Sequence, residues 1–240
     1  MRPISTRFAA RSLIWILLLT VCACTALQPL ARAADLQGRV LLPSSERSTH
    51  RPAVVLWLTP AGSTPAPDPP PPGRFTLVQK DRAFHPHLLV IPVGSTVSFP
   101  NDDPFFHNVF SLFNGKRFDL GLYEAGSSRA VVFSREGVSY IFCNIHPDMS
   151  AVVISLSTPF HATASASGAF TINGVPAGDY ELHTWIEGTP QPANDSLSRR
   201  LRISADEPNT IVIDVSHAPP ASDEHLNKFG KPYGHEVKPY

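Results

Sequence analysis

Short apolar runs separated by turn-forming residues constrain the fold of this chain more than any other sequence feature. The 240 residues include 25 Pro and 14 Gly, which argues against long helices. Closely spaced short strands with turn residues between them predict an all-β sandwich or barrel. Residues 116–126 are the best candidate for a helical turn. We expect strands at 36–42, 53–58, 74–78, 88–91, 96–99, 108–112, 130–133, 138–142, 151–155, 169–172, 180–185, 201–204 and 210–215.

The N-terminal segment has the features of an export signal. Three arginines fall among the first eleven residues, and residues 13–27 form an apolar run that is short for a bilayer span. The small residues around Arg32 predict cleavage after Ala33, which would place the mature chain in the periplasm or outside the cell. We expect no stable membrane span after cleavage. A retained anchor and a lipid attached at Cys24 are the alternatives.

Removal of the signal would leave one cysteine and a net acidic chain. Cys22 and Cys24 lie in the signal, so Cys143 remains alone. Secreted proteins mostly use cysteines in disulfide pairs, so an unpaired one is an intermolecular bridge, a buried accident or a functional thiol. Of the 20 basic and 20 acidic residues, four Arg and no acid fall within residues 1–33. We see no basic stripe and expect no nucleic-acid partner.

The most informative residues lie in a short loop between two expected strands. Cys143, His146 and Met149 follow one another at intervals of three residues. Thiolate, imidazole and thioether are soft or borderline ligands that suit copper in both oxidation states. His107 follows the turn-forming stretch 101–104, and loops at strand ends of a sandwich can meet. We therefore expect these four side chains to surround one copper ion.

Each of these side chains also has an ordinary structural interpretation, and only their joint spacing favours a metal site. A lone buried cysteine is usually inert, and a lone loop histidine usually lies at the surface. Zinc is disfavoured because structural zinc sites rarely use methionine, and a cysteine nucleophile would leave Met149 without a role. His85 and His87 alternate on an expected strand and could form a second metal site, but two surface histidines are the simpler interpretation.

Residues 74–157 resemble the cupredoxins, the family of plastocyanin, pseudoazurin and amicyanin. The loop spacing is similar to that of amicyanin, whereas Phe106 stands where Pro usually precedes the first His ligand. The shared features are Phe84-x-Pro86, the stretch 93–99, Asn101-Asp102 ahead of His107-Asn108, Gly137, and the Cys143, His146 and Met149 loop.

The resemblance implies a Greek-key β-sandwich with one type 1 copper. His107, Cys143 and His146 would be equatorial ligands, Met149 would be axial, and Asn108 would hydrogen-bond across to the copper loop. Such proteins carry single electrons between redox partner proteins. No further histidine cluster suggests a second, catalytic copper, so we expect an electron carrier and not an enzyme.

The surface near the expected copper would be the docking face. His146, stiffened by Pro147, is expected to be the electron port, with Phe105 and Phe106 as the patch beside it. For either phenylalanine alone, a place in the core is the simpler interpretation.

The remaining strands resemble a second module. Gly38-Arg-Val, Ala53-Val-Val-Leu and the later stretch 167–185 resemble the two halves of a carboxypeptidase-regulatory, transthyretin-like sandwich. The resemblance implies that the cupredoxin is inserted between these halves. The layout resembles bacterial proteins of the methylamine-utilisation type. We expect a signal peptide at 1–33, a first half at 34–60, a Pro-rich linker at 61–73, a cupredoxin at 74–157, a second half at 158–216 and a disordered tail at 217–240.

The sequence thus predicts an exported blue copper protein, and two alternatives stay open. The same ligands would serve a copper chaperone or storage protein. The second sandwich could instead be a cell-envelope recognition module in which the metal is only structural.

Overall fold

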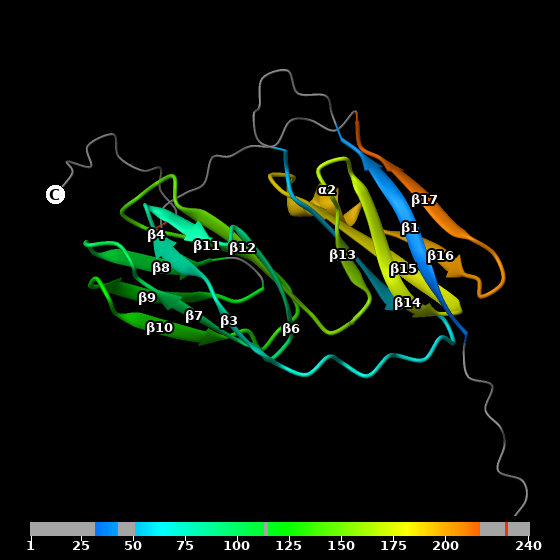
Figure 1. Ribbon diagram of the computed structural model, residues 1–240, viewed down its shortest axis with the longest axis horizontal. Coiled ribbons are helices and arrows are strands. Elements are labelled where there is room, and N and C mark those ends of the chain that lie inside the picture. Colours follow the sequence, from blue (N-terminus) through cyan, green and yellow to red (C-terminus); the bar gives the residue numbers. More distant parts are fainter. Residues whose placement is uncertain (1–31, 43–50, 113–114, 217–228, 230–240) are drawn as a thin grey trace, which may run out of the picture. The chain divides into compact units, whose positions relative to one another are not determined.

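The fold consists almost wholly of strands (Figure 1). The computed structural model describes residues 32–42, 51–112, 115–216 and 229. The helix within them, α2 (Gln191–Asp195), is little more than one turn, so the all-β prediction is confirmed. The expected signal and the expected tail lie almost entirely outside the described residues. No helix of the described ranges is long and apolar enough to cross a membrane.

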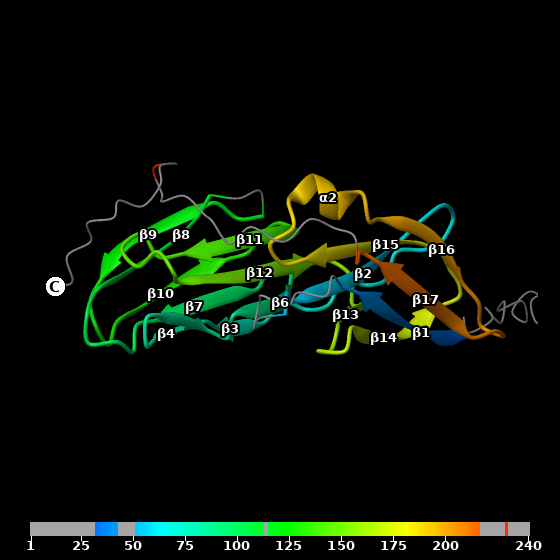
Figure 2. The same ribbon diagram turned by 90° about the horizontal axis from the view of Figure 1, so that it is seen from above.

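One group of strands, the central sandwich, runs from residue 74 to residue 156 (Figure 2). One sheet has the order β6–β12–β11–β8–β9 and a smaller one the order β10–β7–β3. Both sheets contribute to one buried cluster, which includes Phe99 and Ile141. The strands are β3 (Arg74–Thr76), β4 (Val78–Lys80), β5 (Ala83–His85), β6 (Leu88–Pro92), β7 (Thr96–Pro100), β8 (His107–Ser111), β9 (Phe118–Tyr123), β10 (Ser128–Val132), β11 (Gly137–Phe142) and β12 (Ser150–Leu156).

The second group, the terminal sandwich, combines strands from both ends of the described chain. Its sheets have the orders β14–β1–β17 and β13–β2–β15–β16, and they share a cluster that includes Leu56 and Ile172. Strands before residue 61 pair here with strands after residue 157. The strands are β1 (Ala33–Leu41), β2 (Val54–Pro60), β13 (His161–Thr163), β14 (Ala169–Pro176), β15 (Gly178–Ile186), β16 (Arg199–Ile203) and β17 (Asn209–Asp214).

Strand β12 is covered on both of its faces. Every residue of β12 after the first is buried. Successive side chains of a strand point to opposite faces. Ala151 and Val153 belong to the cluster of the central sandwich, whereas Val152 and Ile154 belong to a separate cluster with Trp185 of β15. A continuous apolar run is what a strand needs when both of its faces are covered.

The prediction of a helical turn within residues 116–126 is wrong. The segment contains β9, which pairs antiparallel with β8. Tyr123 is part of the central cluster, and Phe118 and Leu120 pack against it. Pairing along β8 and burial of these side chains decide the conformation, and neither is visible as a local sequence pattern.

His85 and His87 do not alternate along one strand, because His85 ends β5 and His87 lies in the bend before β6, so that prediction is wrong. The two rings have different partners. His85 Nε2 lies 3.3 Å from the carbonyl oxygen of Lys80. The His87 ring lies between two groups: its Nδ1 is 3.1 Å from the carbonyl oxygen of Ser150, and its Nε2 hydrogen-bonds the carboxylate of Glu187. The hydrogen bond to Glu187 raises the pKa of His87 above its ordinary value.

Replacing Glu187 with glutamine should lower the pKa of His87. Because the folded-state pKa of His87 is raised, the pair stabilises the fold fully below the ordinary histidine pKa of about 6.5, and this stabilisation is lost as the pH rises through the raised value. Glu187→Gln should therefore destabilise the protein near about pH 5 and change little near about pH 9. An NMR titration of the His87 ring in both proteins measures the shift. Identical pKa values in the two proteins would contradict the assignment.

Candidate metal centre

His107 stands at the start of β8 and is fully buried. The preceding turn is shaped by Asn101, whose side-chain amide donates to the carbonyl oxygen of Phe105 at 2.8 Å and whose Oδ1 accepts the N–H of Asp103 at 3.1 Å. An Asn side chain that bonds the backbone two to four residues on is a common turn device. The turn places the His107 ring at the edge of the sheet where β11 ends.

Cys143 directly follows β11, and the loop that it opens is tightly closed. The N–H of Cys143 donates to the carbonyl oxygen of Met149 at 3.2 Å, and the N–H of Met149 donates to that of His146 at 3.1 Å. Cys143 and Met149 are buried in the same cluster, whereas His146 is half-buried. The antiparallel pairing of β11 with β12 brings the two ends of the loop together.

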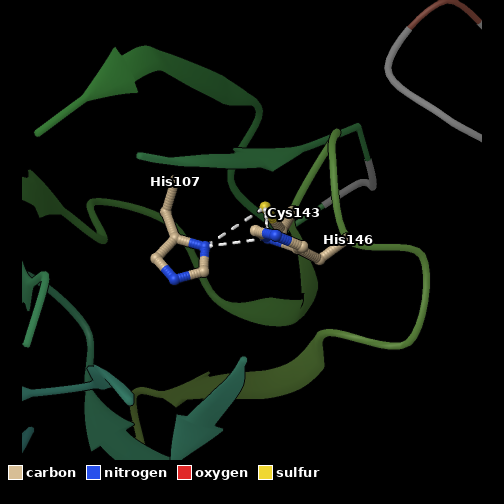
Figure 3. A group of neighbouring side chains, drawn as sticks. All are labelled: His107, Cys143 and His146. Atoms are coloured by element: carbon tan, nitrogen blue, oxygen red, sulfur yellow. Dashed lines mark hydrogen bonds between the residues drawn. The ribbon is translucent and has the colours of Figure 1, made fainter. Parts of the chain in front are cut away.

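The structure brings His107, Cys143 and His146 into one group from two distant parts of the chain (Figure 3). The Cys143 Sγ lies 3.7 Å from His107 Nδ1 and 3.6 Å from His146 Nδ1, and the two Nδ1 atoms are 3.1 Å apart. Bonds of roughly 2.0–2.3 Å from one metal ion would hold three such atoms roughly 3–4 Å from one another. The donor set and its spacing therefore fit a single metal ion.

Burial controls the protonation of these three groups. Burial raises the pKa of the Cys143 thiol, against the opposing effect of backbone N–H groups of Asn108, Ile145 and His146 that donate to the sulfur. Burial lowers the pKa values of His107 and His146, so both rings favour the neutral form that can bind a metal. A cation bound here would displace the thiol proton.

The expected contact of Asn108 with the loop is made by its backbone. Its N–H donates to the Cys143 sulfur, while its side-chain amide donates to Asp119 Oδ1 at 2.7 Å. Asp119 belongs to β9, the strand that the sequence did not predict. The side chain of Asn108 therefore ties β8 to β9 instead of reaching the loop.

The ring of Phe105 packs against both histidines of the group. The Phe105 ring lies 5.2 Å from the His107 ring and 5.6 Å from the His146 ring, between centroids. The guanidinium of Arg82 lies 5.1 Å from the Phe105 centroid. Phe106 points outward and is 54% exposed, so a core position for Phe106 is excluded.

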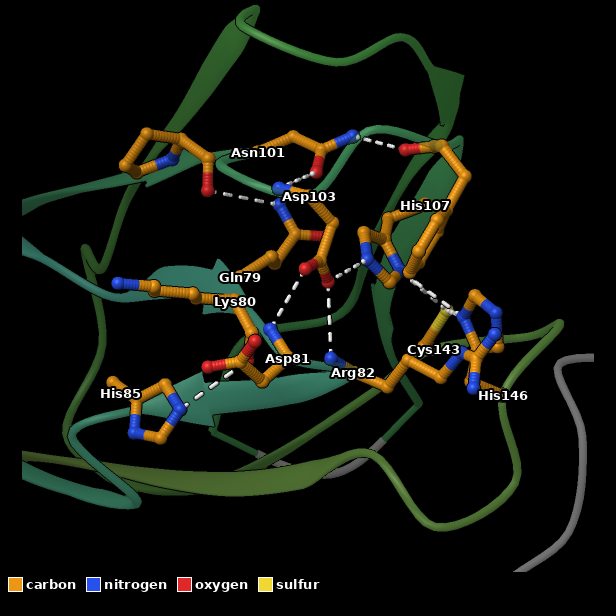
Figure 4. A network of polar contacts seen from close by, with 12 residues as sticks. Gln79, Lys80, Asp81, Arg82, His85, Asn101, Asp103, His107, Cys143 and His146 are labelled. Carbon is orange, nitrogen blue, oxygen red and sulfur yellow. Dashed lines mark hydrogen bonds and ion pairs between the residues drawn. The ribbon is translucent and has the colours of Figure 1, made fainter.

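Asp103 is a residue that the sequence analysis did not single out. Its carboxylate hydrogen-bonds Nε2 of His107 at 2.8 Å (Figure 4). The sequence signal that could have identified it is an acidic residue four positions before an expected ligand. The sequence does not show that the side chain of this residue turns back toward the His107 ring.

Comparison with known proteins gives partial likenesses only. No protein-family model matches the chain, and no curated protein sequence matches it. Among solved structures, a purple cupredoxin from Nitrosopumilus maritimus is 30% identical, over 34% of this chain and 98% of that one, with a TM-score of 0.31. A copper-containing nitrite reductase from Thermus scotoductus is 26% identical, over 40% of this chain and 24% of that one, with a TM-score of 0.33.

A variant of amicyanin in its Cu(I) form is also similar. It is 18% identical, over 34% of this chain and 81% of that one, with a TM-score of 0.33. TM-scores this low carry no weight, so the functional conclusion depends on the chain's own contacts.

Proposed function

We propose that this chain is an exported type 1 copper protein that carries single electrons. His107, Cys143, His146 and Met149 would hold one copper ion. The convergence of two imidazole Nδ1 atoms and one thiol sulfur within 4.8 Å of one another carries the proposal. Bound copper would supply a one-electron couple at this site.

The residue types favour copper over zinc. Structural zinc sites usually combine four Cys and His ligands. Here the described Cys and His residues of the group number three, and Met149 lies buried in the same cluster as Cys143. Two imidazoles, one thiolate and a thioether form the set that suits copper in both oxidation states.

The chain's contacts favour a site that changes little between oxidation states. Two backbone hydrogen bonds close the 143–149 loop, and the His107 ring is fully enclosed. Ligands held by packing and hydrogen bonds do not have to move when the charge of the ion changes by one. A small rearrangement favours rapid electron exchange, which supports the carrier over the storage alternative.

The docking face would surround His146. This ring is half-buried, and Phe106, whose side chain is largely exposed, lies one residue from His107. An exposed apolar side chain near a half-exposed ligand suits a transient protein partner, because it can be desolvated on contact. The donor and acceptor proteins would meet the chain here.

Redox cycling of the copper-loaded protein distinguishes the carrier from the alternatives. We expect an intense visible thiolate-to-Cu(II) band that bleaches with a mild reductant and returns on reoxidation, with all copper retained. Loss of copper to a metal-free acceptor protein during the cycle would support a chaperone instead. Copper-free protein that still folds and binds a cell-envelope ligand would favour the recognition module. A copper-loaded protein without a visible band that bleaches and returns would overturn the carrier proposal.

A further inference from the structure

Asp103 binds the nitrogen of His107 that does not face Cys143 (Figure 4). The Oδ2–Nε2 distance is 2.8 Å, and the two side chains are 5% and 0% exposed. A carboxylate at this distance requires the hydrogen on Nε2, because an ionised carboxylate can only accept. The Nδ1 lone pair then points toward the Cys143 sulfur and His146 Nδ1. Asp103 therefore selects the ring tautomer that a metal at this site needs.

Asp103 is itself held by the hairpin turn between β4 and β5. The N–H of Asp81 donates to Oδ1 at 2.7 Å and the N–H of Arg82 donates to Oδ2 at 3.0 Å. Both residues have φ values of 56°, in the left-handed region that residues other than glycine seldom adopt. The turn between β4 and β5 thus directs two N–H groups at one carboxylate. Positive φ at both central residues is the usual geometry of a two-residue β-hairpin turn.

The two imidazoles of the group are supported differently. His107 is fully enclosed and has a carboxylate on its outer nitrogen. His146 is half-buried, and among the described residues no carboxylate is hydrogen-bonded to its ring. The Asp103 carboxylate is hydrogen-bonded to His107 but acts on His146 only through space, so it orients the His107 ring alone.

We propose that Asp103 is a positioning residue that fixes His107 and favours Cu(II) over Cu(I). The inference rests on the proposed copper function. A carboxylate on the outer N–H of a ligating imidazole raises the basicity of the ligating nitrogen. A more basic ligand and a nearby negative charge stabilise the more highly charged ion. Asp103 therefore strengthens Cu(II) binding and lowers the reduction potential of the site.

The test begins with the metal-free protein, in which copper plays no part. The ¹⁵N chemical shifts of the His107 ring should show the Nε2–H tautomer in the wild type and a mixture of tautomers in Asp103→Ala. Thermal unfolding of each variant checks that the fold is kept. A wild-type ring with its hydrogen on Nδ1 overturns the proposal without any need for a folded variant.

The copper-loaded protein gives the second measurement. Asp103→Asn should weaken Cu(II) binding by about 10–100-fold and raise the reduction potential. Asp102→Asn is the matched control, because it removes the same formal charge from an exposed neighbour, and it should leave Cu(II) affinity within about twofold. Equal affinities and potentials in wild type and Asp103→Asn overturn the role of Asp103. A wild type that binds no copper overturns the proposed function instead, and leaves the tautomer result standing.

Discussion

Replacing Cys143 with serine should abolish the visible colour of the copper-loaded protein and most of its copper affinity. The expected colour comes from charge transfer between a thiolate and Cu(II), and Cys143 is the cysteine whose sulfur lies within 4 Å of both imidazole Nδ1 atoms. A serine hydroxyl is a harder, much less acidic ligand and is not deprotonated as readily by Cu(II). Visible absorption and a copper titration against a competing chelator measure the two losses.

Two variants separate loss of the ligand from loss of the fold. Met149→Leu keeps the thiolate and both imidazoles and preserves the buried volume, so it should stay coloured with a shifted reduction potential. His85→Ala removes an exposed ring that faces Lys80, so it should match the wild type. A Cys143→Ser protein that folds and keeps the visible band would refute the assignment of the thiolate.

Replacing Trp185 with alanine should cost about 3–5 kcal/mol of the free energy of unfolding. Trp185 is 1% exposed and packs with Val152 and Ile154 of β12. Its Nε1–H donates to the hydroxyl oxygen of Tyr140 in β11 at 3.1 Å. Alanine would leave a cavity beside strands that lead directly into the 143–149 loop. Urea unfolding followed by circular dichroism measures the loss.

Trp185→Phe is the matched control for the cavity. It keeps most of the apolar volume and removes the hydrogen bond, which is worth about 0.5–1.5 kcal/mol. We therefore expect its loss of stability to be well below that of Trp185→Ala. A loss below about 1 kcal/mol for Trp185→Ala would mean that this side chain is not buried as described.

The convergence of His107, Cys143 and His146 could be anticipated because two of these candidate ligands share a short loop. Cys143 and His146 lie three residues apart between strands whose apolar runs were plain in the sequence. Strands that neighbour each other in a hairpin return the loop to a fixed place. The position of His107 was harder to predict. Only the turn residues before it and the family resemblance suggested that its strand begins beside that loop.

The support of the site could not be predicted, because it depends on tertiary neighbours. Asp103 turns toward His107 since the N–H groups of Asp81 and Arg82 meet its carboxylate from another hairpin. Strand β9 forms because β8 is there to pair with it. The sequence shows neither the left-handed turn nor that pairing.

The burial of β12 on both faces could not be predicted either, because the sequence shows only that its residues are apolar. The sequence could not show that Trp185, from β15, covers the second face. A tryptophan within a strand pattern is compatible with any half-buried sheet. Only the structure shows which strand the Trp185 side chain covers.

Copper X-ray absorption of the loaded wild-type protein tests the central claim most directly. We predict a first shell with one sulfur and two imidazole nitrogens at short range, from Cys143, His107 and His146. The sulfur should vanish from that shell in Cys143→Ser. A first shell of nitrogen and oxygen alone in the wild type would contradict the account.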